Sequence, residues 1–137
     1  MALSVAAARA QTGTVSRTPF SPGQVWSIKS PSPTTAKVAI VRTEPWGDKV
    51  AVHVSVIDIP IPAGLPRAGE TMGVSHLPFD EAALAASVDQ LLRTDFSPDS
   101  NFVDGYRQWQ SAKGGIFTIS VAQAIEIVFD TVMRTPR

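Results

Sequence analysis

Lys49-Val50-Ala51-Val52-His53-Val54-Ser55-Val56-Ile57-Asp58-Ile59-Pro60 is the longest strand pattern in this chain. Its valines recur at every second position from Val50 to Val56, so they share one face of a strand. The opposite face carries His53 and Ser55 among small and apolar residues. A strand this rich in valine is typical of a sheet covered on both faces. The pattern therefore places a histidine near the core, either as a hydrogen-bonded structural group or as part of a site.

Two shorter strand patterns precede this run, at residues 24–29 and 36–43. Pro45 and Gly47 favour a turn over residues 44–48, since proline presets φ and glycine accepts a positive φ. We therefore expect an antiparallel hairpin of the second and third strands, with the first strand added to the second. After Pro60, a segment rich in proline and glycine predicts a loop that continues to about Ser75.

Asp80 is in position to cap a helix that runs to about Arg93. The expected buried stripe of this helix consists of Leu84, Val88, Leu91 and Leu92. A second helix is expected over residues 101–112, although Gly105 weakens it by about 1 kcal/mol relative to alanine. Gly114 and Gly115 are expected to end it.

Residues 116–119 predict a fourth strand, because this apolar run is too short for a helix. Ser120 and Gln123 then form a capping box, which indicates the start of a final helix. The apolar stripe of that helix consists of Val121, Ala124, Ile125, Val128 and Val132. The expected order is strand–strand–strand–helix–helix–strand–helix. It predicts an α+β fold in which an antiparallel sheet of about four strands packs against helices.

The length of 137 residues indicates one domain, which we place at residues 23–134. Residues 1–22 read as a disordered leader rich in Ala, Ser and Thr. Ala8-Arg9-Ala10 resembles a signal-peptidase cleavage site, but a basic segment and a long apolar run do not precede it. A cytoplasmic location is therefore favoured, and export is the alternative if residues 1–11 are the remnant of a signal peptide that starts upstream.

Composition excludes several classes of function. Twelve basic and twelve acidic residues give zero formal net charge, which argues against nucleic-acid binding. The absence of cysteine excludes disulfides, thiol catalysis and Cys-based zinc sites. No apolar run approaches the roughly 20 residues of a membrane helix. Phosphate-loop and dinucleotide fingerprints are absent, so we expect no cofactor.

His53 and His76 are the two histidines of the chain and the candidate catalytic residues. The alternative for His53 is a structural hydrogen bond, and for His76 a bond to the backbone at the start of the following helix. Neither histidine has the spacing of a metal-binding pair, so we expect no metal site.

Three aromatic residues are candidates for binding. Phe102, Tyr106 and Trp109 share one helix face, where the main expectation is core packing and the alternative is a stacking surface for a ligand. Trp46 is placed in the hairpin turn, where it is either exposed for a partner or folded back onto the sheet edge. Trp46, Tyr106 and Trp109 are therefore our candidate binding residues.

Several short motifs together resemble a group of small, uncharacterised bacterial proteins. They are Gly23-Gln24-Val25-Trp26, Val52-His53-Val54-Ser55-Val56, His76-Leu77-Pro78-Phe79, Tyr106-x-x-Trp109 and Gly114-Gly115-Ile116-Phe117-Thr118-Ile119. The resemblance covers residues 23–132 and implies a bacterial, stand-alone domain. It carries no activity, but it includes both histidines.

The sequence favours a small non-enzymatic binding domain that contacts a protein partner or a second copy of itself. Two alternatives remain. One is a hydrolase-like enzyme that uses His53 or His76 in a cleft beside the Pro/Gly-rich loop. The other is a small-molecule binding domain whose pocket is lined by the aromatic stripe.

Overall fold

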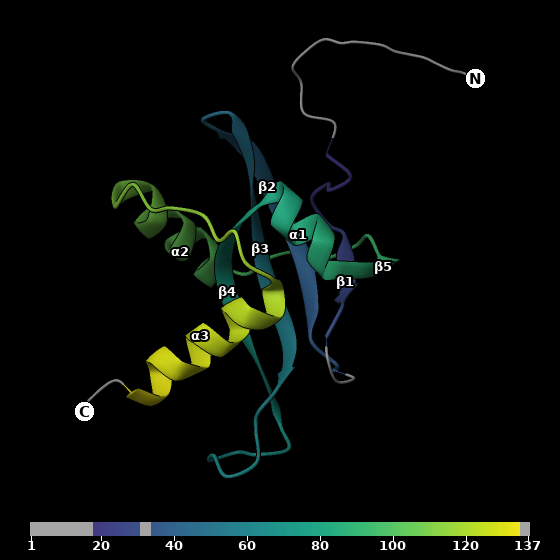
Figure 1. The fold of residues 1–137 in the computed structure, drawn as a ribbon, viewed down its shortest axis with the longest axis vertical. Coiled ribbons are helices and arrows are strands. Elements are labelled where there is room, and N and C mark those ends of the chain that lie inside the picture. Colours follow the sequence, from purple (N-terminus) through teal and green to yellow (C-terminus); the bar gives the residue numbers. More distant parts are fainter. Residues whose placement is uncertain (1–17, 31–33, 135–137) are drawn as a thin grey trace.

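A computed structural model describes residues 18–30 and 34–134 of the chain. In this part of the chain, five antiparallel strands form one sheet in the order β4-β3-β2-β1-β5 (Figure 1). The strands are β1 (Val25–Ile28), β2 (Lys37–Trp46), β3 (Lys49–Pro60), β4 (Thr71–Asp80) and β5 (Val88–Arg93). The helices are α1 (Glu81–Ser87), α2 (Ser100–Ser111) and α3 (Val121–Arg134). The predicted α+β class is confirmed, but the strand count and order differ from the prediction.

The predicted hairpin is confirmed as β2 and β3, and β1 pairs with β2 as expected. The strands continue to the pair Trp46–Lys49, so the turn contains only Gly47 and Asp48. Gly47 has a φ of 65°. Glycine with positive φ in the first position of a two-residue loop is the pattern of a type II′ turn, which matches the twist of the flanking strands. The turn is therefore shorter than predicted, and Glu44 belongs to β2.

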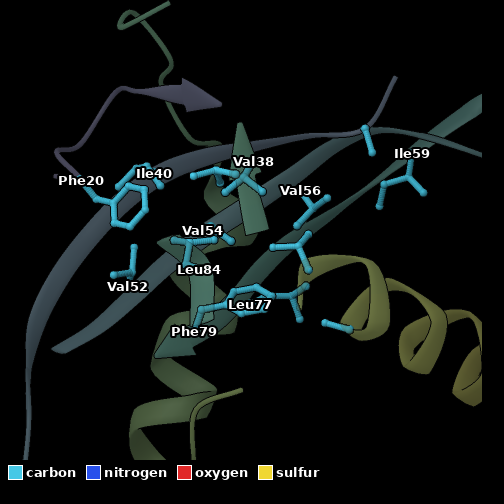
Figure 2. Packing of buried hydrophobic residues seen from close by; sticks show 14 residues of the cluster. Phe20, Val38, Ile40, Val52, Val54, Val56, Ile59, Leu77, Phe79 and Leu84 are labelled. Atoms are coloured by element: carbon cyan, nitrogen blue, oxygen red, sulfur yellow. The ribbon is translucent and has the colours of Figure 1, made fainter. Parts of the chain in front are cut away.

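The valine face of β3 forms the main core (Figure 2). Val52, Val54 and Val56 are fully buried there and pack with residues of every neighbouring layer. The cluster also contains Phe20, Val38, Ile40, Leu77, Phe79, Leu84, Val121 and Ala124. Because α1 contributes Leu84 and α3 contributes Val121 and Ala124, these two helices cover this face of the sheet.

The prediction of one helix over residues 81–93 is wrong beyond Ser87, where α1 ends and strand β5 begins. Leu84 is buried as expected, but Leu91 and Leu92 are each 46% exposed in strand β5. The Ser87 hydroxyl donates to the carbonyl of Ala83, a local bond that competes with continuation of the helix. The same hydroxyl accepts from the backbone N–H of Val121. β5 supplies a partner for the open edge of β1, and satisfying that edge outweighs the helical pattern of residues 88–93.

The predicted loop after Pro60 is shorter than expected, because β4 begins at Thr71. This strand was not predicted because it contains Gly73 and Pro78, which disfavour strands. A proline is nevertheless tolerated in β4, because β4 lies at the edge of the sheet. The predicted strand at residues 116–119 is wrong and reduces to one parallel bridge between Phe79 and Phe117. Phe117 bonds through its N–H to the carbonyl of Pro78 and through its carbonyl to the N–H of Asp80. It thereby covers part of the outer edge of β4.

The last helix is confirmed as α3, and so is its capping box. Ser120 and Gln123 each accept a hydrogen bond from the other's backbone N–H, at 3.2 and 3.1 Å. The side chain of Val132 and the leader at residues 1–17 lie outside what the structure describes. Phe20 packs edge-on against Trp26 at a centroid distance of 5.7 Å, so the packed region includes residues before Gly23. Within the described segments, no helix is long and apolar enough to cross a bilayer.

Candidate functional site

A β-bulge at Val41 determines which side chains reach the histidine face of the sheet. Ile40 and Arg42 pair with consecutive residues of β3, the second of which is His53. Val41 is therefore an extra residue in β2, and such a residue shifts the alternation of the strand by one position. Before the bulge Ile40 points into the main core, and after it Arg42 and Glu44 share the face of His53.

Helix α2 covers this second face with the aromatic stripe predicted from the sequence. The His53 ring centroid lies 4.5 Å from that of Trp109 and 4.9 Å from that of Tyr106, both in edge-on geometry. Phe102 packs edge-on against His76 at 5.3 Å. These distances are those of aromatic pairs in contact. The stripe therefore packs onto the sheet, where it encloses His53 and contacts His76.

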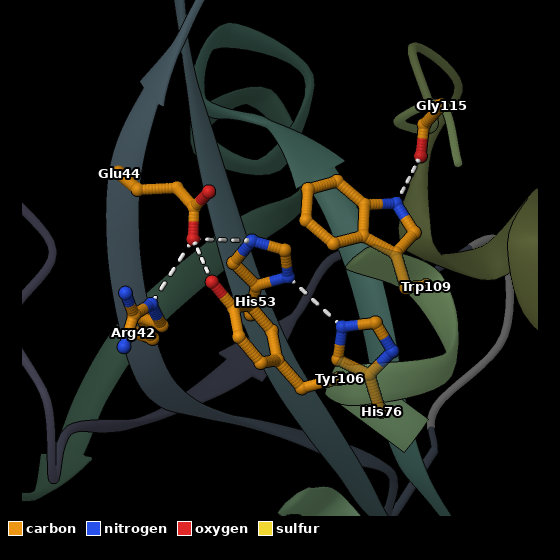
Figure 3. Close-up of polar contacts among 7 residues, drawn as sticks. All are labelled: Arg42, Glu44, His53, His76, Tyr106, Trp109 and Gly115. Atoms are coloured by element: carbon orange, nitrogen blue, oxygen red, sulfur yellow. Dashed lines mark hydrogen bonds and ion pairs between the residues drawn. The ribbon is translucent and has the colours of Figure 1, made fainter. Parts of the chain in front are cut away.

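The two histidines contact each other, which the sequence did not predict (Figure 3). Nδ1 of His53 lies 2.9 Å from Nε2 of His76, and the rings stack with centroids 5.1 Å apart. The alternative considered for His76, a bond to the backbone near the helix start, is not what the structure has, because this ring bonds to His53. Ser55 was noted as a neighbour of His53, yet its hydroxyl donates to the carbonyl of Ser75 instead. His53 is completely buried.

One carboxylate oxygen of Glu44, Oε1, contacts the side chains of Tyr106, Arg42 and His53 (Figure 3). Oε1 accepts a short hydrogen bond of 2.5 Å from the Tyr106 hydroxyl and one of 3.0 Å from Nε of Arg42. It also lies 3.4 Å from Nε2 of His53. The alignment of this third contact falls short of a hydrogen bond, so Nε2 is buried without a hydrogen-bond partner. The Arg42 guanidinium lies 4.8 Å from the Tyr106 ring centroid and adds a cation–π contact.

Burial controls the protonation of the histidines. Burial and the adjacent His76 lower the pKa of His53 to about 4, although Glu44 acts in the opposite direction. Burial also lowers the pKa of His76. Both imidazoles are therefore neutral near pH 7.

The pKa values of the Glu44 carboxyl and the Tyr106 hydroxyl shift in opposite directions. Burial alone would raise the pKa of Glu44, but hydrogen bonds from Tyr106 and Arg42 and the nearby His53 lower it below its usual value. Burial and the hydrogen bond to Glu44 raise the pKa of Tyr106. At neutral pH the pair is therefore an ionised carboxylate that accepts from a protonated phenol.

Gly105, which was predicted to weaken the helix, and Gly114, which was predicted to end it, make room for the rings. A Cβ on Gly105 would lie 2.9 Å from Cβ of His76, closer than real carbon atoms approach. A Cβ on Gly114 would lie 2.4 Å from Cδ1 of Trp109. The Trp109 indole N–H donates to the carbonyl of Gly115 at 2.8 Å. Gly105 therefore allows α2 to approach β4, and Gly114 leaves space for the indole.

The remaining predicted site residue, Trp46, lies outside this enclosed cluster. It ends β2, is 37% exposed, and shares the face of Arg42 and Glu44. The roles of Arg42 and Glu44 were not predicted, because the predicted strand ends at residue 43. The alternation of Arg42, Glu44 and Trp46 was the signal that could have placed them together. Among the residues described by the structure, no group of three His, Asp or Glu side chains is placed to hold a metal ion.

The hydrogen bond between Tyr106 and Glu44 should contribute measurably to stability. We expect Tyr106→Phe to lower the free energy of unfolding by about 1.5 kcal/mol, because a bond to a charged acceptor is lost while Arg42 remains. The pKa of Glu44 should rise at the same time. Urea denaturation and a carboxyl ¹³C NMR titration measure the two effects. Unchanged values of both would show that this bond is absent in solution.

Comparison with known proteins gives no match for this chain among family models, curated proteins or solved structures.

Proposed function

We propose that this protein is a binding domain for a protein partner, with its contact surface at the open end of the β2–β3 hairpin. We call this the Trp46 surface and define it as Arg42, Trp46, Lys49 and Tyr106. The observation that carries the proposal is that Trp46, which is 37% exposed, and Arg42, whose side chain is 54% exposed, share one face of β2. Tryptophan, arginine and tyrosine dominate the binding energy of protein interfaces.

The strand geometry brings these residues together. Trp46 pairs with Lys49 across the hairpin, so both side chains lie on the same face. Glu44 lies two residues before Trp46, about 7 Å along the strand, and bonds to both Arg42 and Tyr106. These bonds hold two members of the surface in place before any partner arrives. Such preorganisation reduces the entropy that is lost on binding.

The surface defines the chemistry of the partner. Nε of Arg42 bonds to Glu44, and no hydrogen bond among the described residues uses its two terminal nitrogens. These nitrogens have the geometry to bind a carboxylate in a bidentate manner. The indole of Trp46 requires an apolar pocket. We therefore expect a partner protein with an apolar pocket and an Asp or Glu side chain beside it.

The two alternatives from the sequence are less favoured by this geometry. His53 is fully enclosed, and it lies seven residues along β3 from Pro60, roughly 23 Å from the Pro/Gly-rich loop. A shared cleft between the loop and His53 therefore has no support. The rings of Tyr106 and Trp109 occupy the space between α2 and the sheet that a bound small molecule would need.

The test begins with a photo-cross-linking amino acid, p-benzoylphenylalanine, at position 46 of the full chain in cells of the source organism. The matched control carries it at Leu92, a similarly exposed residue on the edge strand β5, two strands away from β2. The partner captured only from position 46 is then purified and titrated by calorimetry. We expect Trp46→Ala to weaken its binding at least about tenfold. Leu92→Ala should leave the affinity within about twofold.

Three results would count against the proposal. The first is equal affinity of the wild type and Trp46→Ala for the captured protein. The second is cross-linking of position 46 only to a second copy of this chain, which would indicate self-association. The third is binding of a single-stranded oligonucleotide that requires Trp46. Trp46→Ala should fold with the circular dichroism spectrum of the wild type, but its melting temperature should fall, because an indole that is 37% exposed still has most of its surface buried.

A further inference from the structure

The buried contacts around His53 determine where its proton lies. Glu44 is ionised, and an ionised carboxylate only accepts hydrogen bonds. Its Oε1 atom faces Nε2 of His53 at 3.4 Å. A bare nitrogen lone pair in that position would repel the carboxylate oxygen. Nε2 of His53 therefore carries the hydrogen and meets the carboxylate in a close electrostatic contact.

The protonation of His53 then sets that of His76. A neutral imidazole with hydrogen on Nε2 has a lone pair on Nδ1. That lone pair lies 2.9 Å from Nε2 of His76. The contact is a hydrogen bond only if His76 donates, so Nε2 of His76 also carries hydrogen. Because His76 is neutral as well, its Nδ1 atom is left with a lone pair.

Nδ1 of His76 is the last atom in this series of contacts, and it is accessible to solvent. Nδ1 of His76 makes no hydrogen bond to any described residue and, unlike Nε2 of His53, is not buried. Gly105 lies opposite, where a Cβ would be 3.8 Å from Nδ1. A larger side chain at position 105 would cover the nitrogen. The same glycine that allows the close packing of α2 therefore leaves the acceptor atom open.

We propose that Glu44, His53 and His76 form a relay, with an electrostatic contact from Glu44 to His53 and a hydrogen bond from His76 to His53, that presents Nδ1 of His76 as the acceptor for a ligand O–H or N–H group. His76 is the ligand-binding residue of this site, and His53 and Glu44 are positioning residues. The ligand class is a small hydroxylated or ammonium-bearing molecule, with water as its smallest member. The relay resembles the carboxylate–histidine pairs that orient an imidazole and raise its basicity. Glu44 also bonds to Arg42 and Tyr106 of the Trp46 surface, but Trp46 itself takes no part in the relay.

NMR of the wild-type protein with ¹⁵N-labelled histidine tests the relay directly. We expect both rings as Nε2–H tautomers at pH 7. We also expect a scalar coupling across the hydrogen bond from the Nε2–H of His76 to Nδ1 of His53. A coupling with His53 as the donor, or the absence of any coupling between the rings, would overturn the relay.

Diethyl pyrocarbonate, which acylates accessible neutral imidazoles, tests the open end. Peptide mass spectrometry should show modification of His76 and protection of His53. We expect the His76 rate to lie within about tenfold of that of an unstructured peptide with the sequence of residues 71–80. A rate slowed more than about a hundredfold would show that ligands cannot reach Nδ1.

Discussion

Acidification from pH 7 to pH 4 is expected to reduce the free energy of unfolding by roughly 3 kcal/mol through His53 alone. In the folded protein the pKa of His53 is lowered to about 4, against an ordinary value of 6.5. The unfolded chain therefore binds more protons than the folded chain between these two values. Stability from this group is complete above pH 6.5 and falls as the pH decreases toward 4.

The groups around His53 either lower stability over the same pH range or do not alter the effect of His53. The pKa of His76 on β4 is also lowered, so this residue adds to the loss below pH 6.5. Glu44 on β2 has a lowered pKa, and its contribution is lost only as the pH falls through that lowered value. The permanent charge of Arg42 disfavours protonation of His53, and Tyr106 on α2 does not titrate in acid. The site as a whole is therefore acid-labile.

Urea denaturation at a series of pH values between 4 and 8 measures this effect. His53→Phe keeps a ring of similar size and should flatten the profile between pH 6.5 and 4. If that variant does not fold, His76→Gln supplies the second comparison, because it removes the imidazole closest to His53. A wild-type profile that is flat across this window would contradict the buried, neutral histidine pair.

The hairpin that carries the site was predictable because its signals are local. Alternating valines placed His53 on the face opposite the core, and Gly47 marked the turn. The bulge at Val41 was not predictable, because nothing in Val41 itself differs from an ordinary strand residue. The bulge is decided by which side chains the finished sheet can bury, and Arg42 cannot occupy the place of a core residue.

Contacts distant in the sequence explain the other errors. Residues 88–93 have a helical pattern, yet they form β5 because the short strand β1 needs an edge partner 60 residues away in the sequence, as in the pairing of Ile28 with Val88. The aromatic stripe of α2 was predictable as a stripe, but what it covers was not. Tyr106 meets Glu44 across 62 positions of sequence, and His53 meets His76 across 23. The pattern of a single sequence predicts which residues share a face and where turns occur. It does not predict these long-range contacts, which depend on how the strands and helices assemble.

Gly105→Ala is expected to destabilise the protein by about 2 kcal/mol, although alanine favours a helix by about 1 kcal/mol over glycine. The new Cβ would lie 2.9 Å from Cβ of His76, an atom fixed to the backbone of β4. Neither carbon can swing away as the end of a flexible side chain could. Helix α2 must therefore move outward as a unit.

That movement would also disturb the site. Tyr106 and Trp109 project from α2, so a shift of the helix loosens their contacts with His53 and the bond from Tyr106 to Glu44. We expect an increase in the indole fluorescence response to acrylamide and a pKa of His53 closer to 6.5. Gly115→Ala is the matched control, because a Cβ there meets no atom within 4 Å.

The sign of the change decides between two roles for Gly105. If the alanine variant is more stable than the wild type, helix propensity dominates and the glycine is not required for packing. If it is less stable while Gly115→Ala is neutral, the close approach of α2 to β4 is what the glycine provides. In that case the absence of a side chain at position 105 is part of the site, because it allows the aromatic stripe to enclose His53 and leaves Nδ1 of His76 uncovered.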